Sequence, residues 1–306
     1  VNGGILEVDS GTVGAVTVGG GTLDIDGGTV ASLNLDDGTG HTISGSGTVT
    51  GVTTIDNGTL VQTGVNSQLG TDGTTASTVT VGSGGNYQAN DGIAGDVTNS
   101  GGTITAAGTN FASLINTSGT VTIAAGKMLQ AESLRNDGTL IIGDNATFTG
   151  TGNTFNNAGI ATIANGGSII DAGAINNLAG GTLTFAGDAT VNADSNSVGG
   201  EIVTNAGTFI VNSAANSTAS IGTDAFTNSG TGTIAVNGTA TLDGITTLTN
   251  SSTSTSAINI ATGARLEAIN LNSSAGTIYV AGKLDAVTGI TGGTLKINGG
   301  TLTGTT

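Results

Sequence analysis

The sequence predicts an all-β fold, a right-handed parallel β-helix (β-solenoid) with three short strands in each coil. Three observations lead to this prediction. A self-similar unit of about 17 to 26 residues recurs along the chain, apolar and polar side chains alternate within it, and glycine or asparagine separates the apolar segments. Units of this kind bury their apolar faces only by stacking on neighbouring units. Right-handedness is expected because crossovers between parallel strands are almost always right-handed.

The repeat is most regular in the first residues of the sequence. Residues 4–19 (GILEVDSGTVGAVTVG) align without gaps on residues 21–36 (GTLDIDGGTVASLNLD), so that Leu6 falls on Leu23. Parallel strands of successive coils lie about 4.8 Å apart and bring equivalent residues together. We therefore expect like residues to form columns along the solenoid.

A longer version of the unit follows, marked by Gly-Thr and an alternating apolar pair, as in GTVTI at 119–123. A second apolar column stands eight residues after the first, so that Leu129 follows Val121, and a third column lies a few residues further on. Three columns predict three strands per coil, with Val121 inward and Thr122 outward. Residues 124–135 have helical propensity, but the column through Leu129 favours a strand.

We interpret the chain as one elongated solenoid with three parts: short-repeat coils at 1–61, irregular coils with inserts at 62–98, and longer coils at 99–306. Asparagine recurs just before the Gly-Thr core in the last part, at Asn99, Asn116, Asn136, Asn157, Asn177, Asn205, Asn228 and Asn250. Stacked asparagine side chains can bond to one another as a ladder, and we assign these a structural role.

Composition excludes several classes of protein. The chain contains 5 Lys and Arg residues and 21 Asp and Glu residues, which gives a formal net charge of −16. This negative charge repels nucleic acid and anionic membrane surfaces. The absence of Cys excludes disulfides and thiolate metal sites. No apolar run approaches the ~18 residues of a spanning helix, so we expect no direct membrane insertion. We interpret Val1 as an internal or processed start.

The Asn-x-Gly-Thr-apolar units and the three-column register resemble the β-helical shafts of bacterial surface adhesins. These include autotransporter passengers, filamentous-haemagglutinin-like exoproteins and giant adhesins exported by type I secretion. Residues 113–143 (SLINTSGTVTIAAGKMLQAESLRNDGTLIIG) are especially similar to haemagglutinin-type repeats, whereas the acidity resembles type I adhesins. The calcium-binding nonapeptide of type I secreted proteins is absent. The resemblance implies a secreted cell-surface protein for adhesion or biofilm cohesion, with a glycan or protein receptor as partner.

A self-assembling extracellular fibre or surface-layer subunit is the alternative. The segments GILEVDSGTV and GGTLKINGGTL carry the same unit, so coils of two copies could stack head to tail. The assembly contacts would be Leu6, Val8, Leu295, Lys296 and Ile297. Lys296 would then fall in the column of Glu7 and supply an opposite charge.

No resident cofactor is expected, with calcium as the one candidate. The aligned first coils place Glu7 over Asp24 and Asp9 over Asp26, and carboxylates so close repel one another unless a cation lies between them. Solvated carboxylates are the alternative interpretation, and the one we favour.

Binding residues are expected in the inserts, because loops raised from a rigid scaffold commonly carry function. The candidates are Asp194, Asn196, Asn212 and Asn216, and a further insert is SSTSTS at 251–256. Inserts that a solenoid merely tolerates are the alternative interpretation, and the one we favour.

Catalysis and ice binding are weaker hypotheses. Asp37, His41 and Ser44 contain the residue types of a nucleophile triad, but we favour a solvated corner for the single histidine. Polysaccharide cleavage needs converging carboxylates or a cationic stabiliser, and the acidic residues are scattered along the sequence. Paired outward threonines suit ice binding, yet the second threonine column is interrupted, for example by Ile210. We therefore expect no enzymatic activity.

Overall fold

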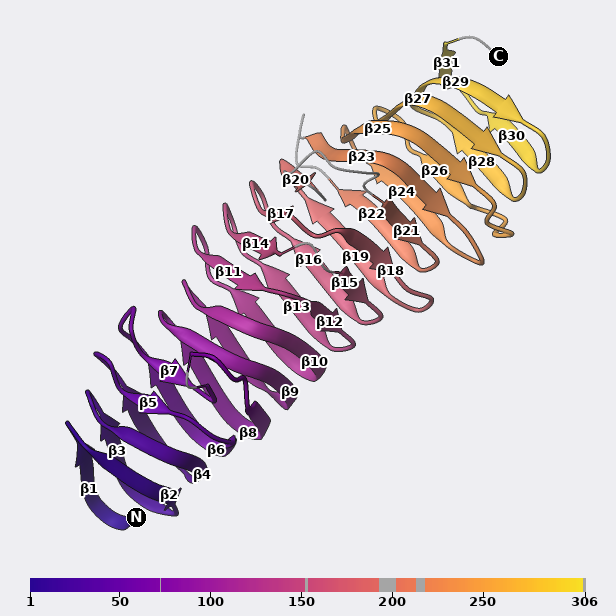
Figure 1. Cartoon of the computed structure of the whole chain (residues 1–306). Helices are drawn as coiled ribbons and strands as arrows, with labels where there is room; N and C mark the ends of the chain where they lie inside the picture. The colour runs from indigo at the N-terminus through magenta and orange to yellow at the C-terminus, as the bar shows by residue number, and fades with distance from the viewer. Residues whose placement is uncertain (72, 152–153, 193–201, 213–217, 305–306) are drawn as a thin grey trace. The chain divides into compact units, whose positions relative to one another are not determined.

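The computed structural model describes residues 1–71, 73–151, 154–192, 202–212 and 218–304. These residues form 31 β-strands and no helix, and their parallel strands stack into a β-solenoid of about 14 turns (Figure 1). The chain divides into two compact units, which are described separately below: unit 1, Val1–Ile141, and unit 2, Ile142–Thr306.

Unit 1 combines strands of 10 to 15 residues, which continue through the corners of the coils, with shorter strands of 2 to 7 residues. Its strands are β1 (Asn2–Val8), β2 (Thr12–Val18), β3 (Gly20–Ile25), β4 (Thr29–Ile43), β5 (Thr48–Val49), β6 (Thr53–Gln62), β7 (Gln68–Leu69), β8 (Thr78–Ala89), β9 (Ile93–Ala106), β10 (Asn110–Ile123), β11 (Met128–Ala131) and β12 (Leu134–Asn136). Strand β13 (Thr139–Ile142) contains the boundary between the units.

Unit 2 begins with short separate strands and continues with longer ones. Its strands are β14 (Thr147–Gly150), β15 (Thr154–Asn157), β16 (Ile160–Ile163), β17 (Ser168–Ile170), β18 (Ala174–Asn177), β19 (Thr182–Ala186), β20 (Ala189–Asn192), β21 (Ile202–Asn205), β22 (Thr208–Asn212), β23 (Thr218–Asn228), β24 (Thr233–Asn237), β25 (Thr241–Asn250), β26 (Ile258–Ile260), β27 (Arg265–Ser273), β28 (Thr277–Val280), β29 (Lys283–Ile290), β30 (Thr294–Ile297) and β31 (Thr301–Thr303).

Each coil contributes three strand segments, and each segment pairs in parallel with the equivalent segment of the next coil. We call the three stacks faces A, B and C. In unit 1 they contain Leu6, Leu23 and Leu60 (A), Val13, Val30 and Val49 (B), and Val18, Leu35 and Ile55 (C). In unit 2 they contain Leu183, Phe209 and Ile234 (A), Phe148, Ile169 and Val191 (B), and Ile175, Val203 and Phe226 (C). The prediction of three strands per coil is confirmed.

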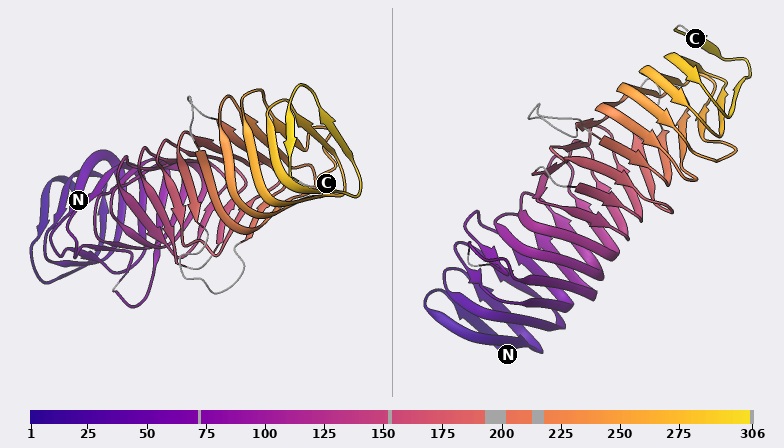
Figure 2. Two further views of the ribbon diagram at one scale, coloured as in Figure 1. Left: turned by 90° about the horizontal axis from the view of Figure 1, so that it is seen from above. Right: turned by 45° about the vertical axis from the view of Figure 1, so that its right-hand side comes forward.

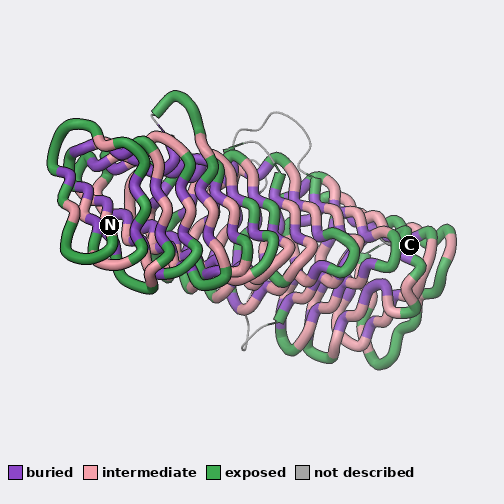
Figure 3. The backbone as a smooth tube through the Cα atoms, turned by 90° about the horizontal axis from the view of Figure 1, so that it is seen from below, coloured by how far each residue is buried: buried purple, intermediate pink, exposed green. Residues whose placement is uncertain are grey.

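The register predicted from the sequence is also confirmed. Leu6 pairs with Leu23, as the gapless alignment of the first two units requires. Val121 is fully buried and Thr122 is only partly so, which gives the expected alternation. Within each unit the buried positions recur from coil to coil (Figure 3), and the same stacking of strands is visible from two further directions (Figure 2). Residues 128–131 and 134–136 are strands, so column position outweighs helical propensity.

Aromatic side chains pack against one another in the core of each unit. In unit 2 the ring centroids of Phe185 and Phe209 lie 5.0 Å apart, and those of Phe209 and Phe226 lie 5.1 Å apart. In unit 1 the rings of Tyr87 and Phe111 stack at 6.1 Å. Such pairs add specific geometry to the burial of apolar area.

Buried asparagines form a hydrogen-bonded ladder on face C of each unit. In unit 1, Nδ2 of Asn99 donates to Asn116 at 2.9 Å and Nδ2 of Asn116 to Asn136 at 2.7 Å. The ladder of unit 2 runs Asn157, Asn177, Asn205, Asn228, Asn250 and ends on the hydroxyl of Ser273, with every step between 2.7 and 3.0 Å. The predicted structural role is confirmed.

The segment interpreted as irregular coils with inserts, 62–98, contains β8 and the first residues of β9. Residues 78–89 and 93–106 are strands, and an antiparallel bridge joins Thr71 to Ala76. A glycine-rich run occupies residues 82–85 within β8. Here it forms a corner against the previous coil: a Cβ on Gly85 would lie 2.0 Å from the carbonyl oxygen of Ile55.

Candidate functional site

An open groove lies on unit 2 where face B turns into face C. It is formed by successive coils of β25, β27 and β29, and its lining consists of Gly244, Ile245, Thr246, Glu267, Ala268, Ile269 and Asp285. Its volume of about 480 Å³ is within the range of small-molecule sites. Of the apolar lining residues, Ile245 and Ala268 are buried, whereas Ile269 is 64% exposed.

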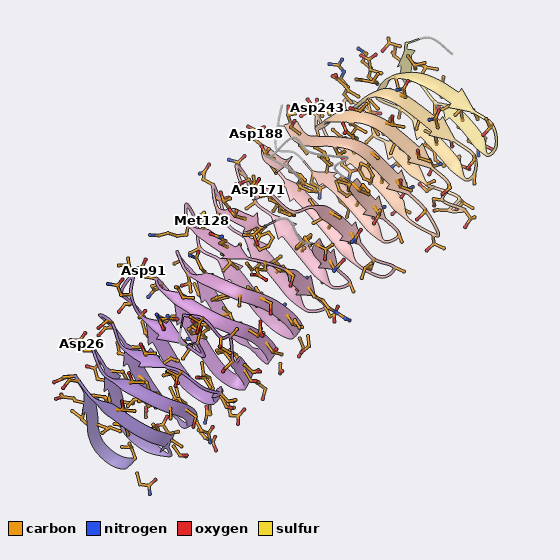
Figure 4. The ribbon with its side chains drawn as sticks, in the orientation of Figure 1. Asp26, Asp91, Met128, Asp171, Asp188 and Asp243 are labelled. Atoms are coloured by element: carbon orange, nitrogen blue, oxygen red, sulfur yellow. The ribbon has the colours of Figure 1, made fainter. Side chains whose placement is uncertain are left out.

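Charged side chains from three coils gather beside the groove. The register pairs Arg265 with Lys283 and Glu267 with Asp285, so two cations and two carboxylates become neighbours on face B. Nη2 of Arg265 lies 2.8 Å from Asp285 Oδ2, Nζ of Lys283 lies 3.1 Å from the same oxygen, and Arg265 also pairs with Glu267. Asp243 precedes the groove in the neighbouring coil and, with Asp171 and Asp188, lies along one edge of unit 2 (Figure 4).

The ion pairs keep this cluster charged. The hydrogen bond from Arg265, with those from Thr303 and Lys283, holds the pKa of the Asp285 carboxyl well below its usual range. The hydrogen bond to Asp285 in turn raises the pKa of the Arg265 guanidinium. A carboxyl held in its ionised form accepts hydrogen bonds and is a poor general acid, since such an acid requires a raised pKa. The arrangement is therefore better suited to binding than to proton transfer.

We expect the Asp285 pairs to stabilise the fold at neutral pH and to lose that effect in acid. The pKa of the Asp285 carboxyl is lower in the folded chain than its unfolded value of about 3.9. Its contribution to the free energy of unfolding is therefore fully present above about pH 3.9 and is lost as the pH falls through the folded pKa. The urea midpoint of Asp285→Asn should fall below that of the unsubstituted chain at pH 7, and the gap should narrow below about pH 4. Asp144→Asn, at an exposed corner, is the control. A gap independent of pH would contradict the assignment.

Sequence reasoning missed this cluster, although a signal was present. The second apolar column contains Leu242 and Leu266 and extends to Leu284, and each of these leucines is followed by an acidic residue in TLDG, RLEA and KLDA. Reading one position beyond the column aligns Asp243, Glu267 and Asp285. The apolar column was used only to predict the core, so the acidic residues that follow its leucines were not recognised as a group.

The predicted calcium residues lie on the first two coils of unit 1. Glu7 and Asp24 are Cα partners on neighbouring strands, as the alignment required. Asp26, labelled in Figure 4, accepts a hydrogen bond from the Ser44 hydroxyl at 2.9 Å. In the part of the chain that the structure describes, no three His, Asp or Glu side chains are grouped so that they could hold a metal ion. Calcium binding by Glu7, Asp9, Asp24 and Asp26 stays a prediction.

A thermal measurement tests the calcium prediction. If a cation lies between the aligned carboxylates, millimolar Ca²⁺ at fixed ionic strength should raise the melting temperature, because a ligand that binds only the folded state stabilises it. Glu7→Gln together with Asp24→Asn should abolish that rise. An unchanged melting temperature in the unsubstituted chain would remove calcium from consideration.

The predicted binding residues of the inserts fall largely outside the described residues, namely Asp194, Asn196 and Asn216. Asn212 is exposed on β22, and its Oδ1 accepts a hydrogen bond from Asn237 of the next coil at 2.9 Å. The insert 251–256 is an ordered corner rather than a raised loop. Its Ser252 hydroxyl is buried and donates to the carbonyl oxygen of Gly232 at 2.7 Å.

The predicted assembly residues lie on face A in both units. In unit 1, Val8 is buried and Leu6 is half-buried. In unit 2, Leu295 is half-buried and Ile297 is 49% exposed. The Lys296 ammonium lies 5.1 Å from the ring centroid of Tyr279, a cation–π contact with the preceding coil.

His41 is in the core, and our expectation of a solvated corner was wrong. Its Nδ1 accepts a hydrogen bond from the backbone N–H of Leu23 at 3.2 Å, so Nε2 carries the proton that is donated to Asp37 Oδ1 at 3.0 Å. Burial disfavours the charged form of Asp37, but hydrogen bonds from Thr39 and His41 outweigh it and hold the pKa of this carboxyl below its usual range. The Ser44 hydroxyl bonds to Asp26, so no nucleophile triad forms.

The reason for the error lies in the alternation of face A. His41 stands two residues before the buried Ile43 and pairs with Leu60, which makes it an inward position despite its polar side chain. The neighbouring acidic residues and glycines at 36–40 suggested a turn exposed to water. A buried imidazole is tolerated there because both of its ring nitrogens have partners.

The threonine array required for ice binding extends over few coils. Thr103 pairs with Thr120 and Thr105 with Thr122 in unit 1. In unit 2 the partner of Thr184 is Ile210. The interruption seen in the sequence therefore recurs in the register of the strands.

The sequence matches no known protein family, and no curated protein is similar to it at a significant level. Among the described residues no helix is long and apolar enough to cross a membrane. The fold is thus assigned from the structure alone, and the β-solenoid is compatible with the shafts that the sequence resembles.

Proposed function

We propose that this chain is a structural and adhesive extracellular protein, a β-helical shaft that mediates cell-surface adhesion or biofilm cohesion. The observation that supports the proposal is the stacking of about 14 turns of parallel strands, with columns of buried residues within each of the two units. Each coil of a solenoid contacts only its neighbours, so adding coils adds length and surface without a larger core. Such a scaffold suits a protein that must present a repeated surface to a partner.

The outward surface also fits an adhesive role. Only 8% of the residues are charged, and the outward positions of face A in unit 2 repeat threonine in register, as at Thr182, Thr208 and Thr233. Short hydroxyl side chains in a regular array offer many weak hydrogen-bonding contacts. Weak contacts that repeat along one scaffold combine into strong attachment, since each binding event raises the effective concentration for the next.

A bead assay tests the proposal. Beads coated with the folded chain should retain bacterial or host cells from suspension, whereas beads coated with the urea-unfolded chain at the same density should not. The unfolded chain has the same composition and charge, so any difference in cell retention is due to the folded surface. Equal retention by both kinds of bead would count against an adhesive function.

A self-assembling fibre or surface-layer subunit is the second candidate. Ile297 is 49% exposed although its coil partner Val280 is fully buried, so an apolar strip remains on face A of unit 2. Coils of a second copy could cover it by stacking Leu6 and Val8 under Leu295 and Ile297. The solution size should then grow with concentration, and Lys296→Glu should reduce this growth. A constant size for both chains would exclude assembly through these residues.

A further inference from the structure

The geometry points to the groove of unit 2 as a binding site for a neutral saccharide, with the Glu267 and Asp285 carboxylates as acceptors for sugar hydroxyls. This assignment rests on the proposed adhesive function and specifies its binding site and the class of its ligand. Face B and face C meet at the groove, and β25, β27 and β29 supply its walls.

The groove offers the two kinds of surface that a sugar ring requires. Ile269, which is 64% exposed, supplies an apolar surface on which the C–H groups of a ring can pack. Glu267 and Asp285 line the same groove and supply hydrogen-bond acceptors. Small-molecule sites commonly combine an apolar lining with a few well-placed polar groups.

The carboxylates are held in position before any ligand arrives. Arg265 bridges Glu267 and Asp285, and Lys283 contacts the same Asp285 oxygen, so the carboxylates that line the groove are held by ion pairs. A carboxylate has about four lone-pair sites, so these ion pairs leave acceptor capacity for further donors. Hydrogen bonds to an ionised acceptor are stronger than those between neutral groups.

The local charge argues for a neutral ligand. In a chain of formal charge −16, the two cations Arg265 and Lys283 balance the two carboxylates that line the groove, and Asp243 beside it leaves only a small net negative charge. A cationic peptide would therefore find little net attraction there, and a polyuronate would meet the carboxylates directly. Hydroxyl groups both donate and accept hydrogen bonds and carry no charge to compensate.

Affinity electrophoresis in gels containing polysaccharide tests the assignment. The probes are three neutral polymers (dextran, mannan and galactan), with polygalacturonate and polylysine as anionic and cationic comparisons. We expect at least one neutral polymer to retard the chain and the charged polymers to act no more strongly at 0.15 M salt. Retardation by none of the neutral polymers, or by polylysine alone, would overturn the assignment.

Matched variants locate the binding. Ile269→Thr removes the apolar rim and Glu267→Gln removes one ionised acceptor, and each should weaken retardation by roughly tenfold. The controls are Ile160→Thr, at an isoleucine that is 55% exposed on face A, and Glu132→Gln, at an exposed glutamate of unit 1. Equal weakening in controls and groove variants would overturn the site.

The two proposals can fail separately. If coated beads retain cells and the groove variants retain them equally well, adhesion stands and the groove assignment falls. If the groove variants lose polysaccharide binding but no coated bead retains cells, the site stands and the adhesive function falls. Circular dichroism of each variant checks that the β-solenoid is intact.

Discussion

Replacing Phe209 by aspartate is expected to lower the free energy of unfolding of unit 2 by several kcal/mol, on the order of 3–5. Phe209 is 1% exposed and contacts the rings of Phe185 and Phe226 in the two neighbouring segments of the core. The substitution removes these ring contacts and places a carboxylate where no cation can reach it. Leu183→Asp and Val191→Asp, at buried positions of faces A and B, are expected to act in the same way.

The neighbouring outward residue provides the control. Thr208 lies beside Phe209 on β22 but faces the surface, so Thr208→Ser should cost less than about 1 kcal/mol. Urea denaturation of the variants, followed by circular dichroism, gives the comparison. Similar losses for Phe209→Asp and Thr208→Ser would contradict the register on which the whole fold assignment rests.

The sequence contained enough information for the fold because the core of a β-solenoid is periodic. Alternation within GTVTI and the fixed distance from Val121 to Leu129 specify which side chains point inward. Stacking then follows, since one coil cannot bury its own inner face. The same reasoning correctly placed a strand at 128–131, where local propensity favoured a helix.

The candidate site was harder to predict because it depends on contacts between coils of unequal length. The ion pair between Arg265 and Asp285 can be predicted only when the number of residues that separates Cα partners on β27 and β29 is known. That number differs from the one for β25 and β27. His41 illustrates a second reason why sequence-based prediction failed. The alternation of face A makes position 41 inward, but polar side chains are expected outside, and no apolar pattern reveals the hydrogen bonds with Leu23 and Asp37 that satisfy the buried imidazole.

The asparagine ladder offers a sharper test of what holds the coils in register. Asn205 is fully buried, accepts from Asn177 Nδ2 at 2.7 Å, and donates to Asn228 Oδ1 at 2.8 Å and to the carbonyl oxygen of Thr233 at 3.0 Å. Leucine has the same branched side-chain skeleton without polar atoms and would continue an apolar column, so Asn205→Leu removes the hydrogen bonds while keeping the site filled. If asparagine merely fills space there, the leucine variant should be as stable as the unsubstituted chain or more so.

We expect instead that Asn205→Leu destabilises unit 2 by about 2–4 kcal/mol, because it leaves a buried donor of Asn177 and a buried acceptor of Asn228 without partners. Asn205→Ser should cost less, since Ser273 already accepts the last bond of the same ladder from Asn250 at 3.0 Å. Asn176→Leu, at the half-buried outward position beside Asn177, is the matched control. It also loses hydrogen bonds, with Asn156 at 2.9 Å and Thr204 at 2.7 Å, but water can replace them at this outward position, so it should cost under about 1 kcal/mol. Denaturant midpoints in the order Asn176→Leu, Asn205→Ser, Asn205→Leu, from highest to lowest, would establish that hydrogen bonding fixes the coil register. A leucine variant at position 205 more stable than the serine variant would refute it.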